Sequence, residues 1–113
     1  MIDVKELRIG NYVFSNMAED EIQISALIES MELAVEPIEL TEEWLVRIGF
    51  ENLLDIKEIY HIGELKGQYL QVILNDGKFV CRLAGKTLRI VKYVHTLQNL
   101  FHSLYEEELT IKN

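Results

Sequence analysis

The sequence contains one cysteine, Cys81, and one proline, Pro37, among 113 residues. A single cysteine cannot form an intrachain disulfide, which is typical of proteins in a reducing cytoplasm. No apolar run approaches the roughly 20 residues needed to cross a bilayer. Residues 1–6 also lack the basic-then-apolar pattern of a signal peptide. We therefore expect a cytoplasmic protein without a membrane-spanning segment.

Residues that favour disorder are scarce as well. The chain has six glycines and one proline, whereas 49% of its residues are hydrophobic. A chain of this length and composition can bury a core without disulfides or metal ions. We expect a single globular domain over residues 1–113.

Basic residues are outnumbered, because 11 Lys and Arg stand against 19 Asp and Glu, a net charge of −8. This balance argues against general nucleic-acid binding, which needs an excess of cations. The charges are unevenly distributed: residues 1–64 carry 15 acidic and four basic side chains, whereas residues 77–105 carry five basic and no acidic ones. The basic segment either forms a binding surface or pairs with acidic side chains of the N-terminal half.

The N-terminal half predicts strands followed by one short helix. Residues 7–15 and the alternating apolar positions within 21–33 predict an antiparallel hairpin, which is consistent with an SH3-like start. Thr41 is suited to the N-cap of a helix that begins with two acidic residues, and Gly49 is suited to end it in a left-handed conformation. We therefore expect a helix over residues 42–48.

The C-terminal half predicts a strand meander and a longer helix. Asn75-Asp76-Gly77 is a hairpin turn signal, and Ala84-Gly85-Lys86 is a second turn. The predicted strands cover residues 58–63, 68–74, 78–83 and 87–91, with a further short edge strand at 109–111. The last helix is predicted over residues 93–105. Together these elements predict an α+β fold with a curved, mainly antiparallel sheet of five or six strands and two helices.

The last helix is amphipathic. One apolar stripe is formed by Tyr93, Leu97, Leu100, Phe101 and Leu104. The opposite face carries His95, Asn99 and His102, which we consider a candidate contact surface for a partner. His95 and His102 lie about 10 Å apart along the helix axis, too far to chelate one metal ion. We expect no metal site.

The sequence shows no catalytic constellation. Cys81 alternates with Phe79 and Leu83 on an apolar face, so we expect a buried structural cysteine rather than a nucleophile activated by a histidine. Trp44 is expected in the core, since only a partly exposed Trp would indicate a partner site. Common nucleotide-binding, hydrolase and zinc-protease motifs are missing. We expect a protein without enzymatic activity and without a cofactor.

The basic strand meander over residues 77–92 is a candidate binding surface for nucleic acid or a partner. Its cations, together with polar side chains of the preceding strand, have the chemistry to hold a phosphate backbone and to stack a base. The candidate residues are Tyr69, Gln71, Lys78, Arg82, Arg89 and Lys92. The alternative is that the cations balance the acidic half of the chain.

Three blocks carry a resemblance to a known family: residues 6–13 (ELRIGNYV), 37–50 (PIELTEEWL, then IGF) and 93–110 (YVHTLQNL, then EELT). Together they resemble a family of small uncharacterised proteins from Bacteroides and related gut bacteria and their phages or mobile elements. The resemblance implies no activity, cofactor or site. In the family a glycine often follows the last helix, and Glu106 stands there in this chain, so we expect that helix end to fray or to be capped in another way.

These observations lead to two hypotheses of function. The first is a non-enzymatic protein-interaction or accessory protein of phage or mobile-element origin, which binds a protein partner and no membrane. The second is a nucleic-acid-binding module that uses the meander over residues 77–92. A hydrolase or metal enzyme is the least supported alternative.

Overall fold

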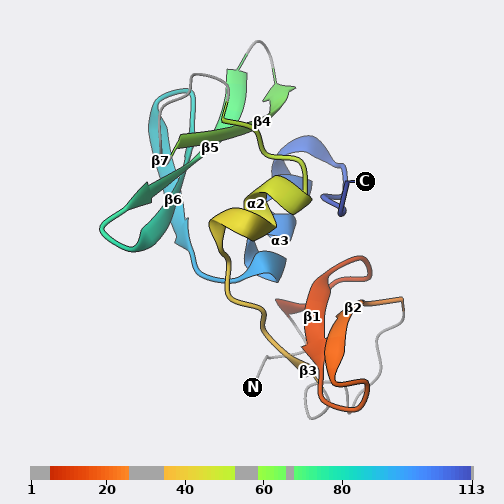
Figure 1. Ribbon diagram of the computed structural model, residues 1–113. Helices are drawn as coiled ribbons and strands as arrows, with labels where there is room; N and C mark the ends of the chain where they lie inside the picture. Colours follow the sequence, from red (N-terminus) through yellow and green to blue (C-terminus); the bar gives the residue numbers. More distant parts are fainter. Residues whose placement is uncertain (1–5, 26–34, 53–58, 66–67, 113) are drawn as a thin grey trace. The chain divides into compact units, whose positions relative to one another are not determined.

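The structure is a computed structural model that describes residues 6–25, 35–52, 59–65 and 68–112, shown in Figure 1. Within these residues the fold is α+β, with two helices and seven strands in two antiparallel sheets ordered β2-β1-β3 and β4-β5-β6-β7. The predicted α+β class is therefore confirmed. The strands form two sheets rather than one, and both sheets are open, so the first hairpin is not part of an SH3-like barrel.

The chain divides into two compact units, each of which combines distant parts of the sequence. The first unit consists of Met1–Glu39 and Tyr93–Glu108, and the second of Leu40–Lys92 and Leu109–Asn113. The first contains 12 acidic and two basic residues, a net charge of −10, whereas the second contains seven acidic and nine basic residues, a net charge of +2. The uneven charge of the sequence thus follows the division of the fold. The single domain over residues 1–113 stays a prediction.

The first unit contains the three-stranded sheet. β1 (Tyr12–Ser15) pairs antiparallel with β2 (Asp20–Gln23) and with β3 (Val35–Glu36). The predicted N-terminal hairpin is confirmed, although β1 begins five residues later than expected because a turn at residues 8–11 precedes it. The small core of this sheet consists of Leu7, Val13, Ile24 and Val35, with Ile22 packed against it. Residues 26–33 of the predicted second strand lie outside the described part of the chain.

Helix α3 (Val94–Tyr105) also belongs to this unit, and its position agrees with the prediction to within one residue. Tyr93 forms its N-cap in an extended conformation, and its side chain does not cap the helix. At the other end Glu106 adopts the left-handed conformation, with φ 58°, and its N–H donates to the His102 carbonyl over 2.8 Å. The helix end is therefore capped rather than frayed. A non-glycine residue in this conformation costs about 1 kcal/mol.

The second unit begins with helix α2 (Glu42–Arg47), which the sequence predicted closely. The Thr41 hydroxyl accepts from the Trp44 N–H over 3.2 Å. Gly49 has φ 103°, and the N–H of Phe50 donates to the Leu45 carbonyl over 2.9 Å, which is the Schellman arrangement. Local capping chemistry therefore fixes both ends of this short helix.

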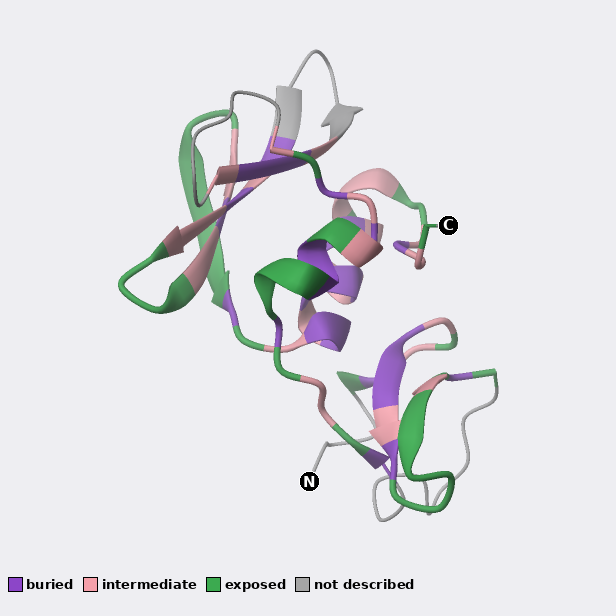
Figure 2. Ribbon diagram, viewed as in Figure 1, coloured by how far each residue is buried: buried purple, intermediate pink, exposed green. Residues whose placement is uncertain are grey.

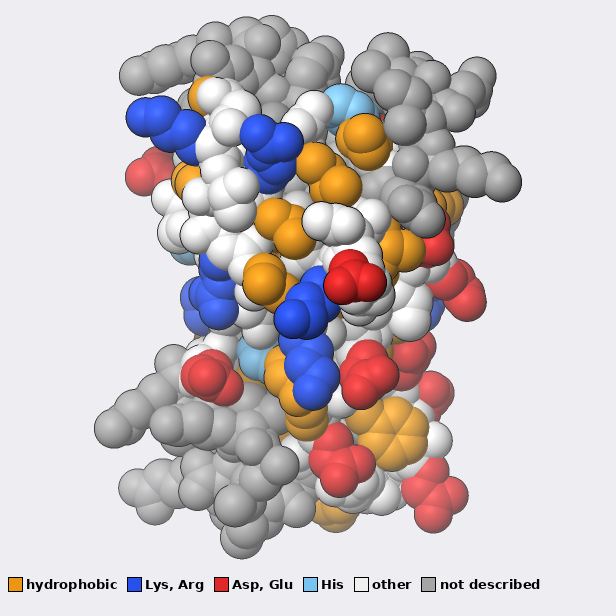
Figure 3. Space-filling view, turned by 90° about the vertical axis from the view of Figure 1, so that its left-hand side faces the viewer, with side chains coloured by type: hydrophobic (Ala, Val, Ile, Leu, Met, Phe, Trp, Pro, Cys, Tyr) orange, Lys and Arg blue, Asp and Glu red, His pale blue; other side chains and the backbone are white. Residues whose placement is uncertain are grey.

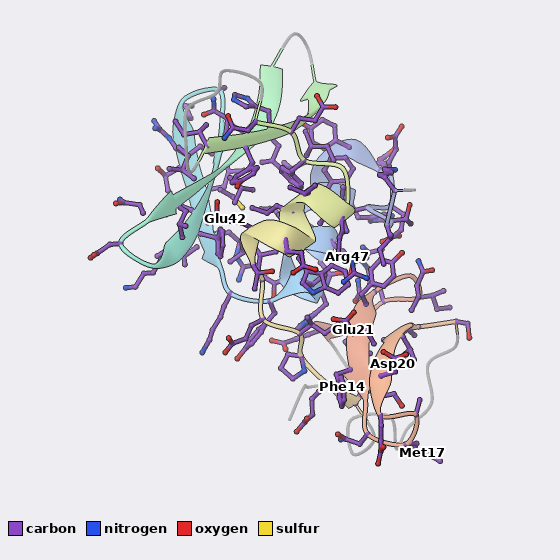
Figure 4. The ribbon with its side chains drawn as sticks, viewed as in Figure 1. Phe14, Met17, Asp20, Glu21, Glu42 and Arg47 are labelled. Carbon is purple, nitrogen blue, oxygen red and sulfur yellow. The ribbon has the colours of Figure 1, made fainter. Side chains whose placement is uncertain are left out.

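Side-chain contacts are made both within α2 and from α2 to the sheet. Trp44 is buried as expected, and within the helix the Arg47 guanidinium lies 4.1 Å from the centre of its ring. The Tyr60 hydroxyl donates to the Glu42 carboxylate over 2.5 Å. That bond, together with burial and the negative charge of Glu42, raises the pKa of Tyr60 to about 12. Figure 4 shows Glu42 and Arg47 on the helix.

The four-stranded sheet of this unit is the predicted meander. Its strands are β4 (Ile59–Leu65), β5 (Gln68–Asn75), β6 (Lys78–Leu83) and β7 (Lys86–Val91). The turns Asp76-Gly77 and Ala84-Gly85 have positive φ at both positions, as type I′ hairpins require. One face is buried and includes Tyr60, Leu70, Val72, Cys81 and Val91.

The predicted edge strand at residues 109–111 is not formed. Leu109 is buried, and the N–H of Lys112 donates to the Arg47 carbonyl over 2.6 Å. The end of the chain therefore satisfies a carbonyl at the C-terminus of α2 instead of joining a sheet.

Candidate functional site

The second sheet has an outer face on which four aliphatic side chains form a continuous row. The register pairs Ile59 with Ile73, Ile73 with Val80, and Val80 with Ile90, one residue from each of the four strands. Ile90 is 53% exposed, and the other three are half-buried. Figure 3 shows hydrophobic side chains gathered in a band over this side of the unit, with Lys and Arg beside them. We call these four residues the aliphatic row.

A polar row runs beside the aliphatic row on the same face. The register aligns His61 with Gln71, Gln71 with Arg82, and Arg82 with Thr87. The Arg82 guanidinium donates from Nη2 to the Gly85 carbonyl over 2.7 Å, which holds it at the turn between β6 and β7. His61 is buried, whereas Thr87 is exposed. The outer face is therefore apolar in one row and polar in the next.

A β-bulge between β6 and β7 decides which side chains reach this face. Lys86 pairs with Leu83 and Thr87 with Arg82, but Arg89 pairs with Cys81, so Leu88 is an extra residue in β7. Uninterrupted pairing would place Arg89 opposite Val80 on the outer face. The bulge turns Arg89 to the inner side and brings Ile90 outward.

β7 is exposed along most of its length. Residues 86–90 are all exposed, and Figure 2 shows the contrast with the buried part of β5. In the described part of the chain β7 pairs only with β6, so it forms the edge of the sheet. Leu88 is 40% exposed. Cations and exposed aliphatic side chains thus occupy the same edge strand.

The predicted meander residues are not gathered on one surface. Gln71, Lys78 and Arg82 share the outer face, whereas the bulge places Arg89 on the inner side, so the contact of these residues with nucleic acid or a partner stays a prediction. Lys78 is exposed beside the turn between β5 and β6, and Lys92 is exposed after β7. Tyr69 belongs to β5, but its side chain lies outside the described part of the structure.

Cys81 is fully buried on the inner face, as expected. Burial raises the pKa of its thiol to about 12, although the nearby charge of Arg89 acts in the opposite direction. His61 points to the other face of the same sheet, because it aligns with Gln71 while Cys81 aligns with Val72. The sheet therefore separates the histidine from the thiol.

Polar side chains of α3 form hydrogen bonds within the first unit. Gln98 is fully buried, and its Oε1 accepts from the Tyr12 N–H over 2.8 Å while its Nε2 donates to the Gly10 carbonyl over 2.9 Å. One side-chain amide thus satisfies a backbone donor and a backbone acceptor at the start of β1. Gln98 was not among the predicted site residues, although its side chain makes the two bonds that hold β1 to α3.

Asn99 extends this contact. Its Oδ1 accepts from Arg8 Nε over 2.8 Å and from Asn11 Nδ2 over 2.9 Å, and its Nδ2 donates to the Glu6 carbonyl over 2.6 Å. Arg8 also forms a two-pronged pair with Glu108, with both N–O distances 2.9 Å. The candidate contact residue Asn99 is therefore occupied within the unit.

Gly10 allows the close approach that this network needs. Its φ is 101°, and an added Cβ would lie 3.0 Å from the Glu108 side chain. Both the backbone conformation and the space therefore favour glycine at this position.

His95 does not lie on an exposed polar face. It is 2% exposed and its ring stacks on Tyr93 with centroids 5.7 Å apart, so the expectation that it faces outward is wrong. Burial lowers the pKa of His95, and the Glu6 carboxylate raises it by a smaller amount. His102 is half-buried, so His95, Asn99 and His102 do not form one exposed contact surface.

The described residues contain no group of three His, Cys, Asp or Glu side chains placed to hold a metal ion. Neither of the helices in the described residues is long and apolar enough to cross a membrane. Comparison with protein-family models, with curated proteins and with solved structures finds no match. The resemblance to the Bacteroides and phage family therefore stays a prediction.

Replacing Gln98 with Leu should destabilise the protein by about 3 kcal/mol, because the buried Tyr12 N–H and Gly10 carbonyl each lose the partner that Gln98 supplies. Urea unfolding followed by circular dichroism measures this. Gln23→Leu is the matched control: its exposed amide donates to the same Gly10 carbonyl over 3.2 Å, and its loss should cost less than about 1 kcal/mol. Equal effects of the two substitutions would contradict the role given to Gln98.

The stability of the protein should fall as the pH is lowered from 7 to 5. The folded pKa of His95 is lowered, so below its ordinary value of 6.5 the unfolded chain binds the proton more readily than the folded one. Protonation of His95 can lower the free energy of unfolding by at most about 1.4 kcal/mol per pH unit. Urea unfolding at several pH values measures this. The free energy of unfolding should change less steeply with pH in His95→Phe than in the unchanged protein. Identical slopes would show that His95 is not held neutral by the fold.

Proposed function

We propose that this chain is a non-enzymatic protein-interaction protein that binds a partner protein through the outer face and exposed edge of the β4–β7 sheet. The observation that carries the proposal is the aliphatic row, which ends in the 53% exposed Ile90 on an edge strand. A connected set of aliphatic side chains reaching the surface is typical of contact sites for other proteins. An accessory role in a phage or mobile element is part of the proposal and is supported by the sequence resemblance alone.

The chemistry of the sheet supports binding rather than catalysis. The Cys81 thiol is buried with a pKa raised to about 12, so at neutral pH it is not a nucleophile. The sheet places His61 on the opposite face, where it cannot accept the thiol proton.

A protein partner suits the outer face better than single-stranded nucleic acid. Nucleic acid is held by cations together with aromatic side chains on which bases stack. The side chains that the structure describes in the aliphatic row are Ile and Val, and Arg89 lies on the other side of the sheet. The meander therefore offers Arg82 and Lys78 to a phosphate backbone, while its aliphatic row suits apolar side chains of a protein.

Ile90→Glu should reduce capture of the partner at least tenfold, because a carboxylate at the exposed end of the aliphatic row prevents its burial. The measurement is quantitative mass spectrometry of proteins retained from an extract of the source cells by the immobilised chain. Met17→Glu is the control. Met17 is 87% exposed in the turn between β1 and β2, marked in Figure 4, and this change should leave capture unaffected.

Two results would contradict the proposal. One is an equal loss of captured proteins with both substitutions. The other is capture that disappears after nuclease treatment, which would favour the nucleic-acid alternative.

A further inference from the structure

We infer that β7 binds its partner by strand addition, and that the partner supplies an extended segment in which acidic and aliphatic side chains alternate. This inference rests on the proposed function of the same sheet and specifies the chemistry of the partner. It is carried by the position of β7 at the edge of the sheet in the described part of the chain, by the faces to which its side chains are assigned, and by the charge of the meander.

β7 is an edge strand in the described part of the chain. Within the described residues β7 is hydrogen-bonded to β6 on one side and is the terminal strand on the other. In an antiparallel pair the backbone groups of alternate residues point away from the neighbouring strand, and at an edge they are left for another chain. Residues 86–90 are all exposed, which gives an incoming strand access to these groups.

The side chains of β7 are divided between the two faces of the sheet. Lys86 and Arg89 lie on the inner side, since they align with Leu83 and Cys81. Thr87 and Ile90 lie on the outer side, since they align with Arg82 and Val80. An added strand would therefore place one set of its side chains beside two cations and the alternate set beside Ile90, where aliphatic side chains would lengthen the aliphatic row. Complementary cross-strand pairs of these kinds contribute roughly 0.2–1 kcal/mol each.

The charge of β7 disfavours pairing of this strand with a second copy of itself. Two copies of β7 placed side by side would bring together Lys86 and Arg89 from both chains, with no acid from residues 77–105 to offset them. Like charges across a strand pair are destabilising. The same cations favour an acidic strand, so charge complementarity selects a different segment rather than a second β7.

The inference is tested with a labelled eight-residue peptide of alternating Glu and Val, titrated into the isotope-labelled protein at low salt. Chemical-shift changes should concentrate in the backbone amides of residues 86–91. A peptide of the same sequence with alternate N-methylated amides keeps the charge but cannot form the strand ladder, and it should bind at least tenfold more weakly. Equal binding of the two peptides would show plain electrostatic attraction and would overturn strand addition.

Two protein variants distinguish the effect of a charge at the β7 edge from the effect of the overall charge on peptide binding. Arg89→Glu should weaken binding of the Glu-Val peptide at least tenfold. Lys78→Glu makes the same charge change at an exposed position beside the β5–β6 turn and should weaken it less than threefold. Circular dichroism checks that both variants are folded. Equal effects of the two variants, or no binding of the peptide to the unchanged protein, would refute the inference.

Other occupants of the edge give recognisable results. Concentration-dependent association of the protein alone in sedimentation, strengthened by Arg89→Glu because that change removes like-charge repulsion, would identify a second copy and overturn the inference. Shift changes in residues 86–91 produced by oligo-dT, with none from the peptide, would do the same in favour of nucleic acid. If Ile90→Glu abolishes partner capture while the peptide fails, the proposed function stands and strand addition alone is wrong.

Discussion

The buried side-chain amide of Gln98 is the interaction on which the N-terminal unit depends. It binds the Tyr12 N–H and the Gly10 carbonyl at once, over 2.8 Å and 2.9 Å. A buried backbone group left without a hydrogen bond costs about 1–3 kcal/mol, so this one residue fixes where β1 begins relative to α3. Helix α3 therefore holds the start of β1 in place through this side chain.

The internal hydrogen bonds of α3 limit where the protein can bind a partner. Asn99 and Arg8 continue the network from Gln98, and His95 is buried beside Tyr93. The polar face of α3, which looks like a contact surface in sequence, is therefore largely used for internal bonds. In the second unit β7 is the terminal strand of its sheet among the described residues, and its residues 86–90 are exposed. The extra residue Leu88 in β7 places Arg89 on the inner side of the sheet and Ile90 on the outer side, so the cation is separated from the aliphatic row.

The sequence predicted the parts of the fold that local chemistry decides. Thr41 and Gly49 define α2 because an N-cap hydroxyl and a left-handed glycine act within a few residues. Asp76-Gly77 likewise fixes the pairing of Ile73 with Val80, since a type I′ turn sets the register of its hairpin. The division into two sheets was not predicted, because alternation marks strands but does not say which of them pair.

The candidate site was harder to predict for physical reasons. Helical periodicity assigns polar side chains to solvent, and it cannot recognise that Gln98 satisfies backbone groups 86 and 88 residues away. The bulge has no signature in the sequence, so the side of the sheet on which Arg89 lies could not be predicted. Glu106 takes a left-handed conformation that favours glycine, which shows that helix capping can override the intrinsic preference of a residue.

Residue-resolved amide hydrogen exchange of the free protein tests the account most directly, because it reports on both the internal network and the open edge. The account predicts slow exchange at the Tyr12 amide, held by Gln98, and fast exchange at the alternate amides of β7 that face away from β6. Protection along the whole of β7 would mean that its edge is already covered. Rapid exchange at Tyr12 would mean that Gln98 does not hold this amide. The two results together would contradict both the role of Gln98 and the open edge of β7.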